Sequence, residues 1–539
     1  MLPRKILIVG SGAEAWMTAA HLDGVLNREG RRFADVAVLD LPGAPQTGVG
    51  KSTMASFNHA LAVMGVDQFE FMRRVDGTFK QSSKFVNWLH VGGDSFHHPF
   101  GLERTGPVDT VGRRWLRSNR SVPFAETISV QPGLCEMNLA PQMLGPWDFG
   151  PPLPFAYHLD EAKLGDYLRE VSTARGVKRY ADAVAGVDMG ENGNIAAINT
   201  ASGGRLEADL FVDCSGSAAL LSGKEPGVEW DDCSQWLPCN QVLTMQVPYE
   251  HFYPGYIRPF TTATALSAGW VLEIPLRDRR SLRYVHCGDF LDQGEAEAEL
   301  RAFEGRHADS LSVDTSSLKA GRRENAWVGN CIAIGNSAGM TDPLVSTELY
   351  MCGLAAAMLA DHFPLGDELH SLAFRFNRIM ANRFYEILDF VNLHYCLTQR
   401  TDTDFWIEAQ KRDRINDRLQ AKLDYWRHKP PSRSDFEDQF FPGQAERPLR
   451  SSGLPGDYRS PVDTAGLWGY ENYEVLLYGM DFLREECDDW FGKDRPDPQV
   501  LANVVERLSV AWKKLPPHDL WLKQAIGMPD YPVSKPVIN

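Results

Sequence analysis

The sequence has few cysteines, and none of them has the spacing of a metal ligand. Nine cysteines are scattered through 539 residues, without the Cys-x-x-Cys pairs that zinc and iron–sulfur sites use. We therefore expect no metal centre and no dense disulfide scaffold. An odd number of scattered thiols fits a reducing compartment, so the sequence predicts a cytoplasmic protein.

Long hydrophobic runs and an excess of positive charge are also missing. No apolar run approaches the roughly 18 residues that a membrane helix needs. The basic start resembles a signal peptide, but its apolar run covers only residues 6–9 and is better interpreted as a strand. With 55 Lys and Arg against 71 Asp and Glu, the net charge is −16, which argues against nucleic-acid and anionic-membrane partners.

The composition that is present is that of a folded enzyme with more than one packed region. Apolar runs at residues 5–9 and 36–39 predict two buried parallel strands, joined by a helix over residues 16–26. Two further strands of this type are expected at residues 207–216 and 331–335, and each runs into a glycine turn. This alternation predicts an α/β fold with a Rossmann-like sheet.

The first of these turns has a dinucleotide-binding pattern. It reads Gly10-x-Gly12-x-x-Ala15, and the following strand ends at Asp40. Glycines at these positions let backbone N–H groups approach a pyrophosphate, and an acid at the second strand can bind a ribose hydroxyl. The motif predicts a dinucleotide but does not distinguish FAD from NAD.

A second glycine-rich segment has to be separated from a P-loop. Gly48-Val-Gly-Lys-Ser52 ends as a P-loop does, but the earlier glycine of that motif is replaced by Pro45, and Gly43 is two residues too distant. We therefore exclude nucleotide hydrolysis and expect a glycine loop beside the dinucleotide.

The chain is expected to divide into two parts. Residues 1–428 form an α/β body, and residues 429–539 begin with an irregular connection rich in Pro, Ser and Gly, which extends to about residue 466. The remainder has helical periodicity and many aromatic residues, which indicates a smaller, mainly helical part. No internal repeat is found.

The order of the glycine turns resembles that of the flavin monooxygenase-like fold, with Gly335 and Asn336 in the last turn. Over its whole length the chain resembles one subfamily, the flavin-dependent halogenases of the tryptophan-halogenase type. The stretches that carry the resemblance are Gly48-Val-Gly50, GTFKQSSKFVNW at 77–88, FHHPFG at 96–101, Ala156-Tyr-His-Leu-Asp160, Gly269-Trp-Val-Leu-Glu-Ile-Pro275, Trp327-x-Gly-Asn330, Asp342-Pro-Leu-Val-Ser-Thr347, Arg400-x-Asp-Thr-x-Phe-Trp406 and Leu515-Pro-Pro-His-Asp519.

The resemblance implies a reaction and a catalytic lysine. Reduced FAD and O2 give a flavin hydroperoxide, a bound chloride or bromide is oxidised to hypohalous acid, and a lysine delivers the halogen to an indole- or phenol-type ring. Lys80 matches that lysine. Burial in a dry tunnel would lower the pKa of the amine and favour its neutral form. Lys84 is expected on the same face if this segment is helical, in a supporting role.

The resemblance also implies the residues of each subsite. Cofactor binding falls to Gly10, Gly12, Ala15, Asp40, Gly50, Gly335 and Asn336. Halide binding falls to the backbone N–H groups of Thr347 and Glu348. Substrate binding falls to His98, Phe100, Val345, Trp468 and Tyr470. For Trp468 and Tyr470, packing within the C-terminal part is an equally good interpretation.

Four positions depart from the family pattern. Val345 replaces the glutamate that precedes the Ser-Thr pair, Glu348 replaces the glycine after it, Leu272 replaces a tryptophan, and Lys51 replaces an acid. The change at Val345 removes the carboxylate partner of Lys80 and puts free tryptophan in doubt as the substrate. Glu348 is either a favourable first-turn acid or, if it points inward, a charge that weakens halide binding.

Two alternatives remain beside a two-component halogenase. With one dinucleotide motif and no second one for a nicotinamide, the chain is expected to depend on a separate NAD(P)H-dependent flavin reductase. The first alternative is a single-component flavin monooxygenase that hydroxylates an aromatic ring. The second is a flavoprotein that binds without catalysis, which the presence of Lys80 argues against. The sequence leaves open whether the small aromatic substrate is free or carrier-bound.

Overall fold

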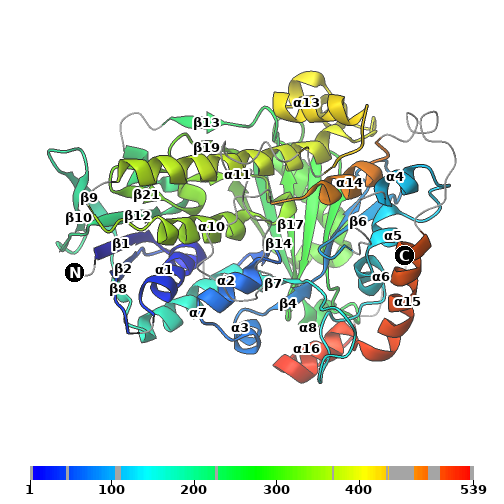
Figure 1. Cartoon of the computed structure of the whole chain (residues 1–539), viewed down its shortest axis with the longest axis horizontal. Coiled ribbons are helices and arrows are strands. Elements are labelled where there is room, and N and C mark those ends of the chain that lie inside the picture. Colours follow the sequence, from blue (N-terminus) through cyan, green and yellow to red (C-terminus); the bar gives the residue numbers. More distant parts are fainter. Residues whose placement is uncertain are drawn as a thin grey trace.

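The structure is a computed structural model that describes residues 4–28, 30–43, 48–102, 111–224, 229–366, 369–432, 435, 467–482 and 498–533. Figure 1 shows a parallel sheet and its helices at one end, an antiparallel sheet in the middle, and the last helices at the other end. Among these residues, no helix combines the length and the apolar character needed to cross a membrane.

A six-stranded sheet contains all four strands that the sequence predicts. Its strand order is β20-β21-β12-β1-β2-β8, and β1 pairs in parallel with β2 on one side and β12 on the other. The carboxyl ends of the parallel strands therefore meet at one edge, where glycine turns follow them. Its strands are β1 (Arg4–Gly10), β2 (Ala34–Asp40), β8 (Lys178–Ala181), β12 (Leu210–Cys214), β20 (Trp327–Val328) and β21 (Cys331–Ala333).

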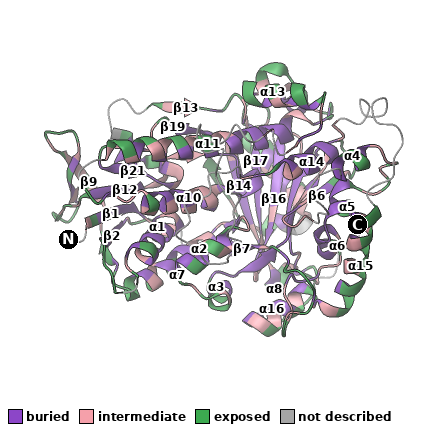
Figure 2. Ribbon diagram, viewed as in Figure 1, coloured by how far each residue is buried: buried purple, intermediate pink, exposed green. Residues whose placement is uncertain are grey.

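Helices cover one face of this sheet, and its other face packs against Ile195 and Ile198 of the strand at residues 195–200. The first helix, α1, packs against α7 and α10, and its buried alanines allow close approach of those helices. The longest described helix, α11, runs from the parallel sheet to the antiparallel sheet in Figure 1, and its second half is almost wholly buried (Figure 2). These helices are α1 (Gly12–Leu26), α7 (Glu161–Ala174), α10 (Glu348–Asp361) and α11 (His370–Cys396).

A small sheet joins the two large ones. In it, β7 pairs on one side with β3 and on the other with β4, so that His158 lies opposite both Ser52 and Thr78. Strand β7 therefore separates the glycine loop of residues 48–50, which runs into β3, from β4, which ends at Lys80. The strands are β3 (Gly50–Ser52), β4 (Thr78–Lys80) and β7 (Ala156–Asp160).

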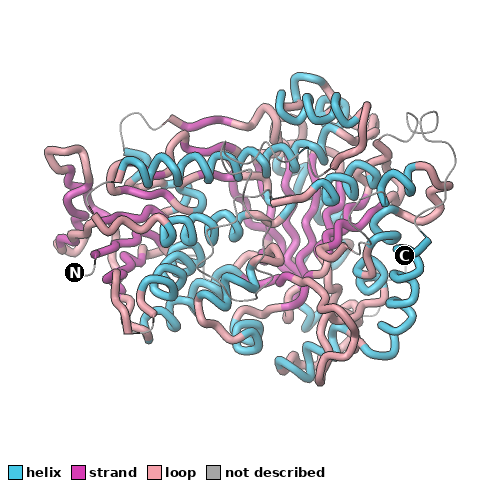
Figure 3. Tube along the Cα trace, viewed as in Figure 1, coloured by secondary structure: helices cyan, strands magenta, loops and turns pink. Residues whose placement is uncertain are grey.

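The antiparallel sheet occupies the centre of the molecule (Figure 3). Its order is β18-β14-β17-β16-β15-β5-β6. It packs beside the aromatic cluster that contains Trp88, Trp270 and Trp468. Its strands are β5 (Ser82–Val86), β6 (Ser95–Pro99), β14 (Gln241–Pro248), β15 (Thr261–Ala265), β16 (Gly269–Pro275), β17 (Arg279–His286) and β18 (Val313–Ser317).

The C-terminal part is helical where it is described. Helix α14 packs on β6 and α5, α15 packs on α5 and α6, and α16 packs on α3. Residues 433–434 and 436–466 of the expected connection lie outside the described residues, and the division after residue 428 stays a prediction. These helices are α3 (Gln68–Arg74), α5 (Phe124–Ile128), α6 (Gln131–Glu136), α14 (Tyr470–Gly479), α15 (Pro498–Lys514) and α16 (His518–Ile526).

Further described helices and strands surround this frame. They are α2 (Phe57–Val63), α4 (Val111–Leu116), α8 (Tyr249–Phe252), α9 (Gln293–Glu304), α12 (Asp404–Ala409), α13 (Asp417–Trp426), β9 (Val184–Met189), β10 (Ile195–Thr200), β11 (Arg205–Leu206), β13 (Trp230–Asp232), β19 (Gly321–Arg323) and β22 (Gly339–Met340).

Candidate active site

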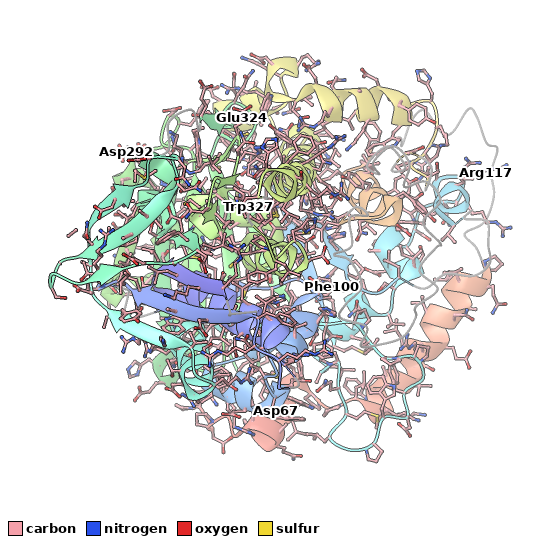
Figure 4. All side chains as sticks on the ribbon, turned by 60° about the vertical axis from the view of Figure 1, so that its left-hand side comes forward. Asp67, Phe100, Arg117, Asp292, Glu324 and Trp327 are labelled. Atoms are coloured by element: carbon pink, nitrogen blue, oxygen red, sulfur yellow. The ribbon has the colours of Figure 1, made fainter. Side chains whose placement is uncertain are left out.

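Lys80 is the last residue of β4, and its side chain is buried in the interior. Only 1% of its surface is exposed. The Nζ atom donates to Ser346 Oγ at 2.9 Å and lies 5.5 Å from the centre of the Phe100 ring. Phe100 is half-buried, and Figure 4 labels it near the middle of the view, whereas Asp67, Asp292 and Arg117 lie nearer the outline. The predicted catalytic amine is therefore enclosed between a hydroxyl group and an aromatic face.

The electrostatic surroundings of Lys80 favour the neutral amine. Burial lowers the pKa of Lys80 to about 7, because an ammonium group loses hydration there without gaining a counter-ion. Among the described residues, no carboxylate pairs with its Nζ atom, and Val345 is apolar and buried. The amine is thus held in a dry place, as the sequence predicts, without a carboxylate partner.

Lys84 does not share the face of Lys80. The segment is extended instead of helical, and the two lysines lie on β4 and β5. Lys84 Nζ pairs with Glu136 Oε1 at 2.5 Å, and that glutamate is largely exposed. The helical placement expected for Lys84 is therefore wrong: β4 and β5 belong to different sheets, and an ion pair holds the Lys84 side chain at Glu136. The supporting role of Lys84 stays a prediction.

The loop before α10 presents polar groups to Lys80. A short 3-10 turn covers Pro343–Val345, and Ser346 after it adopts a left-handed conformation with φ of +62°, which is strained for a residue with a side chain. Ser346 Oγ also forms a hydrogen bond with Ser52 Oγ of β3. Hydroxyl groups of Ser52 and Ser346 thus link the glycine loop to the lysine.

Thr347 caps α10 at the end of this loop. The first backbone N–H groups of a helix have no partners within it and favour an anion. The Thr347 side chain is fully buried, and its Oγ1 has no hydrogen-bond partner among the described residues. An unpaired buried hydroxyl beside free N–H groups can accommodate a small anion.

A buried chain of hydrogen bonds fixes the start of the loop. Trp270 Nε1 donates to Tyr395 Oη at 2.8 Å, and Tyr395 Oη donates to Asp342 Oδ2 at 2.6 Å. Asp342 Oδ1 accepts from the backbone N–H of Leu344 at 3.0 Å. Burial raises the pKa of Asp342 to about 6. Trp270 is therefore a core residue that positions the loop through Tyr395.

Two of the four family departures contact each other. Lys51 Nζ lies 2.6 Å from Glu348 Oε1 and 3.7 Å from Glu161 Oε2, and Arg283 Nη1 lies 3.3 Å from Glu348 Oε2. Burial alone would raise the pKa of Glu348, but the two cations lower it to about 2. Glu348 is therefore ionised, and Lys51 and Arg283 balance its negative charge. Its carboxylate points toward Lys51.

The predicted flavin turns have the backbone that a dinucleotide requires. Gly12 has φ of +70°, and no protein atom lies within 4 Å of where a Cβ would be. Gly335 has φ of +71° at the start of the turn Gly335–Ser337. Asp40 ends β2 as expected, and its carboxylate pairs with Arg179 Nε at 2.7 Å. These residues fit the diphosphate and ribose parts of a flavin cofactor.

The remaining flavin residues lie in the same region. Ala15 is buried at the start of α1, and Gly50 begins β3 with the Ser281 side chain in front of it. The backbone N–H of Asn336 donates to the Glu14 carboxyl group. A pocket lined in part by Gly335, Asn336 and Glu348 continues toward α10 and α11.

The aromatic end of the site is built from β6, α11 and α14. His98 Nε2 lies 3.1 Å from Asn472 Oδ1, and the His98 ring is 5.6 Å from that of Phe390. Burial lowers the pKa of His98 to about 4, so the ring is neutral. Trp468 stacks on Phe390 at 4.1 Å, and Tyr473 meets Phe390 edge-on.

The structure brings the predicted residues together to different degrees. Phe100 reaches Lys80 directly, and Val345 and Thr347 flank its partner Ser346. Trp468 is 3% exposed and is used in packing against Phe390, and Tyr470 is buried nearby at the start of α14.

Sequence reasoning missed several residues of this region. They are Glu14, Ser52, Arg283, Phe390, Tyr395 and Asn472. Ser52 and Glu14 lie inside motifs that the sequence shows, so position in the motif was an available signal. The others are single polar or aromatic residues without a local pattern.

Comparison with known proteins gives a consistent result. The family model for tryptophan halogenase matches residues 5–491. The chain is 32% identical to tryptophan 7-halogenase RebH of Lentzea aerocolonigenes over 516 residues, which cover 92% of this chain and 91% of that protein. It is 30% identical to tryptophan 6-halogenase ThaL of Streptomyces albogriseolus, with 89% and 93% of the two chains covered.

A solved structure shares this architecture. The crystal structure of a tryptophan halogenase from Shewanella frigidimarina superposes with a TM-score of 0.85 at 27% identity, over 98% of each chain.

Proposed function

The chain belongs to the tryptophan halogenase family, and from this premise we propose that it halogenates an electron-rich aromatic compound other than free tryptophan, with Lys80 as the catalytic residue. Enzymes of this family are flavin-dependent halogenases that use FADH2, O2 and a halide, so halogenation is favoured over hydroxylation. The observation that carries the proposed role is the buried Lys80 amine, 2.9 Å from Ser346 Oγ.

Cofactor and halide would be held by the turns around the sheet edge. Backbone groups at Gly10, Gly12 and Gly335 would hold the flavin, with the Thr347 and Glu348 N–H groups holding the halide. When bound, reduced FAD together with O2 supplies the oxidising power that converts the halide to an electrophilic halogen. The chain's own task is to exclude water and to direct that electrophile.

Lys80 would transfer the halogen to the substrate in two steps. In the first, the neutral amine attacks the halogen of hypohalous acid, which forms an N–halogen bond and releases water. In the second, an aromatic carbon takes the halogen from Nζ, and the ring proton is lost as the N–H bond is restored. A pKa of about 7 leaves a large neutral fraction near neutrality, as a nucleophilic amine requires.

The substrate would lie between Lys80 and the aromatic residues of β6 and α11. Phe100 and His98 offer flat faces and a neutral imidazole, which suit an indole or a phenol. Val345 provides no carboxylate for an ammonium or an indole N–H group. This combination supports a simple indole, a phenol or a larger indole-bearing molecule.

A separate NAD(P)H-dependent reductase would supply the reduced flavin. One dinucleotide motif serves the FAD, and the cofactor must enter already reduced. We therefore expect weak, reversible FAD binding. Purified protein that retains FAD through dialysis and reduces it with NADPH alone would contradict the two-component arrangement.

The decisive experiment supplies the purified chain with FADH2, O2 and either chloride or bromide. A panel of tryptophan, indole, substituted indoles and phenols is then analysed by product mass and halogen isotope pattern. We expect a monohalogenated indole or phenol. Hydroxylated products without halogen would contradict the proposed function.

A further inference from the structure

One carboxyl group lies where the two flavin turns meet. Glu14 belongs to the first turn of α1, between Gly12 and Ala15. Its Oε1 and Oε2 atoms accept from the backbone N–H of Asn336 at 3.2 and 3.3 Å. A Cβ atom on Gly335 would collide with this carboxyl group. Glu14 therefore contacts the turn of residues 335–337 from within the Gly10–Ala15 motif.

The charges around Glu14 come from three other elements. Burial raises its pKa to about 8, Glu161 of α7 and Glu348 of α10 act in the same direction, and Lys51 of β3 and the Asn336 N–H oppose them. Lys51 itself is engaged by Glu348 and Glu161. The titratable thiols near Glu14 are those of Cys214 and Cys352.

Among the described residues, Glu14 forms no ion pair. An ionised Glu14 would repel any diphosphate that approaches the two turns, because like charges at close range disfavour each other. A neutral carboxylic acid behaves differently, since its O–H can donate to a phosphate oxygen while its other oxygen keeps the Asn336 N–H. The same position is thus unfavourable to FAD in one protonation state and favourable in the other.

We infer that Glu14 is a cofactor-binding residue that acts as a neutral carboxylic acid, donating a hydrogen bond to the diphosphate of FAD, so that bound flavin retains a proton on this side chain. The inference rests on the FAD-dependent function proposed above. It adds a residue outside the glycine positions of the motif. It also makes FAD affinity dependent on pH, independently of catalysis.

The test measures FAD affinity of the full-length protein by flavin fluorescence from about pH 6.5 to about pH 9. With a pKa of about 8, wild-type Kd at pH 9 should be about tenfold higher than at pH 7. Glu14→Gln keeps a neutral donor, so its Kd should be within about twofold of wild type at pH 7 and should not rise at pH 9. Thermal melts at both pH values establish that each protein is folded.

Calorimetry gives a second readout that does not depend on the affinity itself. Titrations at about pH 8.5, in two buffers of different ionisation enthalpy, report the protons taken up with FAD. About three-quarters of a proton is expected for wild type and none for Glu14→Gln. Equal proton uptake by both proteins would overturn the inference.

Two controls separate Glu14 from its surroundings. Glu161→Gln removes a carboxylate from the first turn of α7 that raises the pKa of Glu14. The rise in the Kd for FAD should therefore begin at lower pH, with the same steepness. Riboflavin has no diphosphate, so its Kd should not follow the FAD curve. A flat wild-type FAD curve, a Glu14→Gln curve that follows wild type, or a riboflavin curve that follows FAD would each overturn the inference.

The outcomes also distinguish this inference from the proposed function. FAD binding without pH dependence contradicts only the role of Glu14. A folded protein that binds no FAD at any pH contradicts the halogenase function and the inference together.

Discussion

Lys51 and Glu348 form an ion pair of 2.6 Å across 297 positions of sequence. Each is a departure from the family pattern, and together they place opposite charges at the start of α10. Arg283 contributes a second cation to the same carboxylate. The negative side chain at the expected halide loop is therefore compensated, so one departure offsets the other.

The first prediction concerns this pair. Glu348→Gln removes the counter-charge that Lys51 and Arg283 share beside the N-terminus of α10, and leaves Lys51 with only the more distant Glu161. The KM for halide should therefore fall by about fivefold, equivalent to about 1 kcal/mol. Lys51→Met removes a cation, so the KM for halide should rise. The KM of the double variant should lie between those of the two single variants. Halide KM values that are equal in all four proteins would show that the pair does not act on the halide.

The second prediction concerns Lys80. Lys80→Met keeps the length of the side chain but removes the amine, so product formation should fall at least about 100-fold. FADH2 oxidation should continue, because the amine acts after the flavin step. Lys84→Met on the neighbouring strand is the matched control and should keep wild-type product formation. Product from Lys80→Met at the wild-type rate would exclude the proposed mechanism.

The third prediction concerns pH. Because burial lowers the pKa of Lys80 to about 7, the neutral amine is the minor form at pH 6 and the major form at pH 8. Halogenated product per FADH2 consumed should rise about tenfold between these values and then level off. This ratio removes pH effects on flavin oxidation from the measurement. A ratio that falls with rising pH would instead indicate that the ammonium form donates a hydrogen bond to hypohalous acid.

The fourth prediction concerns Val345. Val345→Glu introduces a carboxylate next to Ser346, the hydrogen-bond partner of Lys80. It should raise kcat/KM on indoles, because a polar anchor of this kind contributes about 1–3 kcal/mol. Val345→Leu controls for the change in volume and should give no such gain. A wild-type preference for tryptophan over indole, or equal kcat/KM values for the glutamate and leucine variants, would contradict this role of Val345.

Much of the fold was predictable because its signals are local. Apolar runs, glycine turns and the acid at the end of the second strand each lie within a few residues, and β1, α1 and β2 form where the pattern indicates. Lys80 could be proposed as the catalytic lysine because a whole set of stretches resembles a family. The strand conformation around Lys80 could not be predicted, because the segment FKQSSKF has no clear helical or strand periodicity.

The sequence by itself determined the elements, the glycine turns and the chemical groups available to the site. Only the tertiary structure decided which of those groups meet. Ser346 reaches Lys80 from 266 positions away, Glu348 reaches Lys51, and Glu14 reaches Asn336. Local propensity acts over a few residues, whereas contacts of this kind depend on how separate sheets and helices pack. The neutral state of Lys80 depends on that packing as well, because burial removes the hydration that would keep its amine charged.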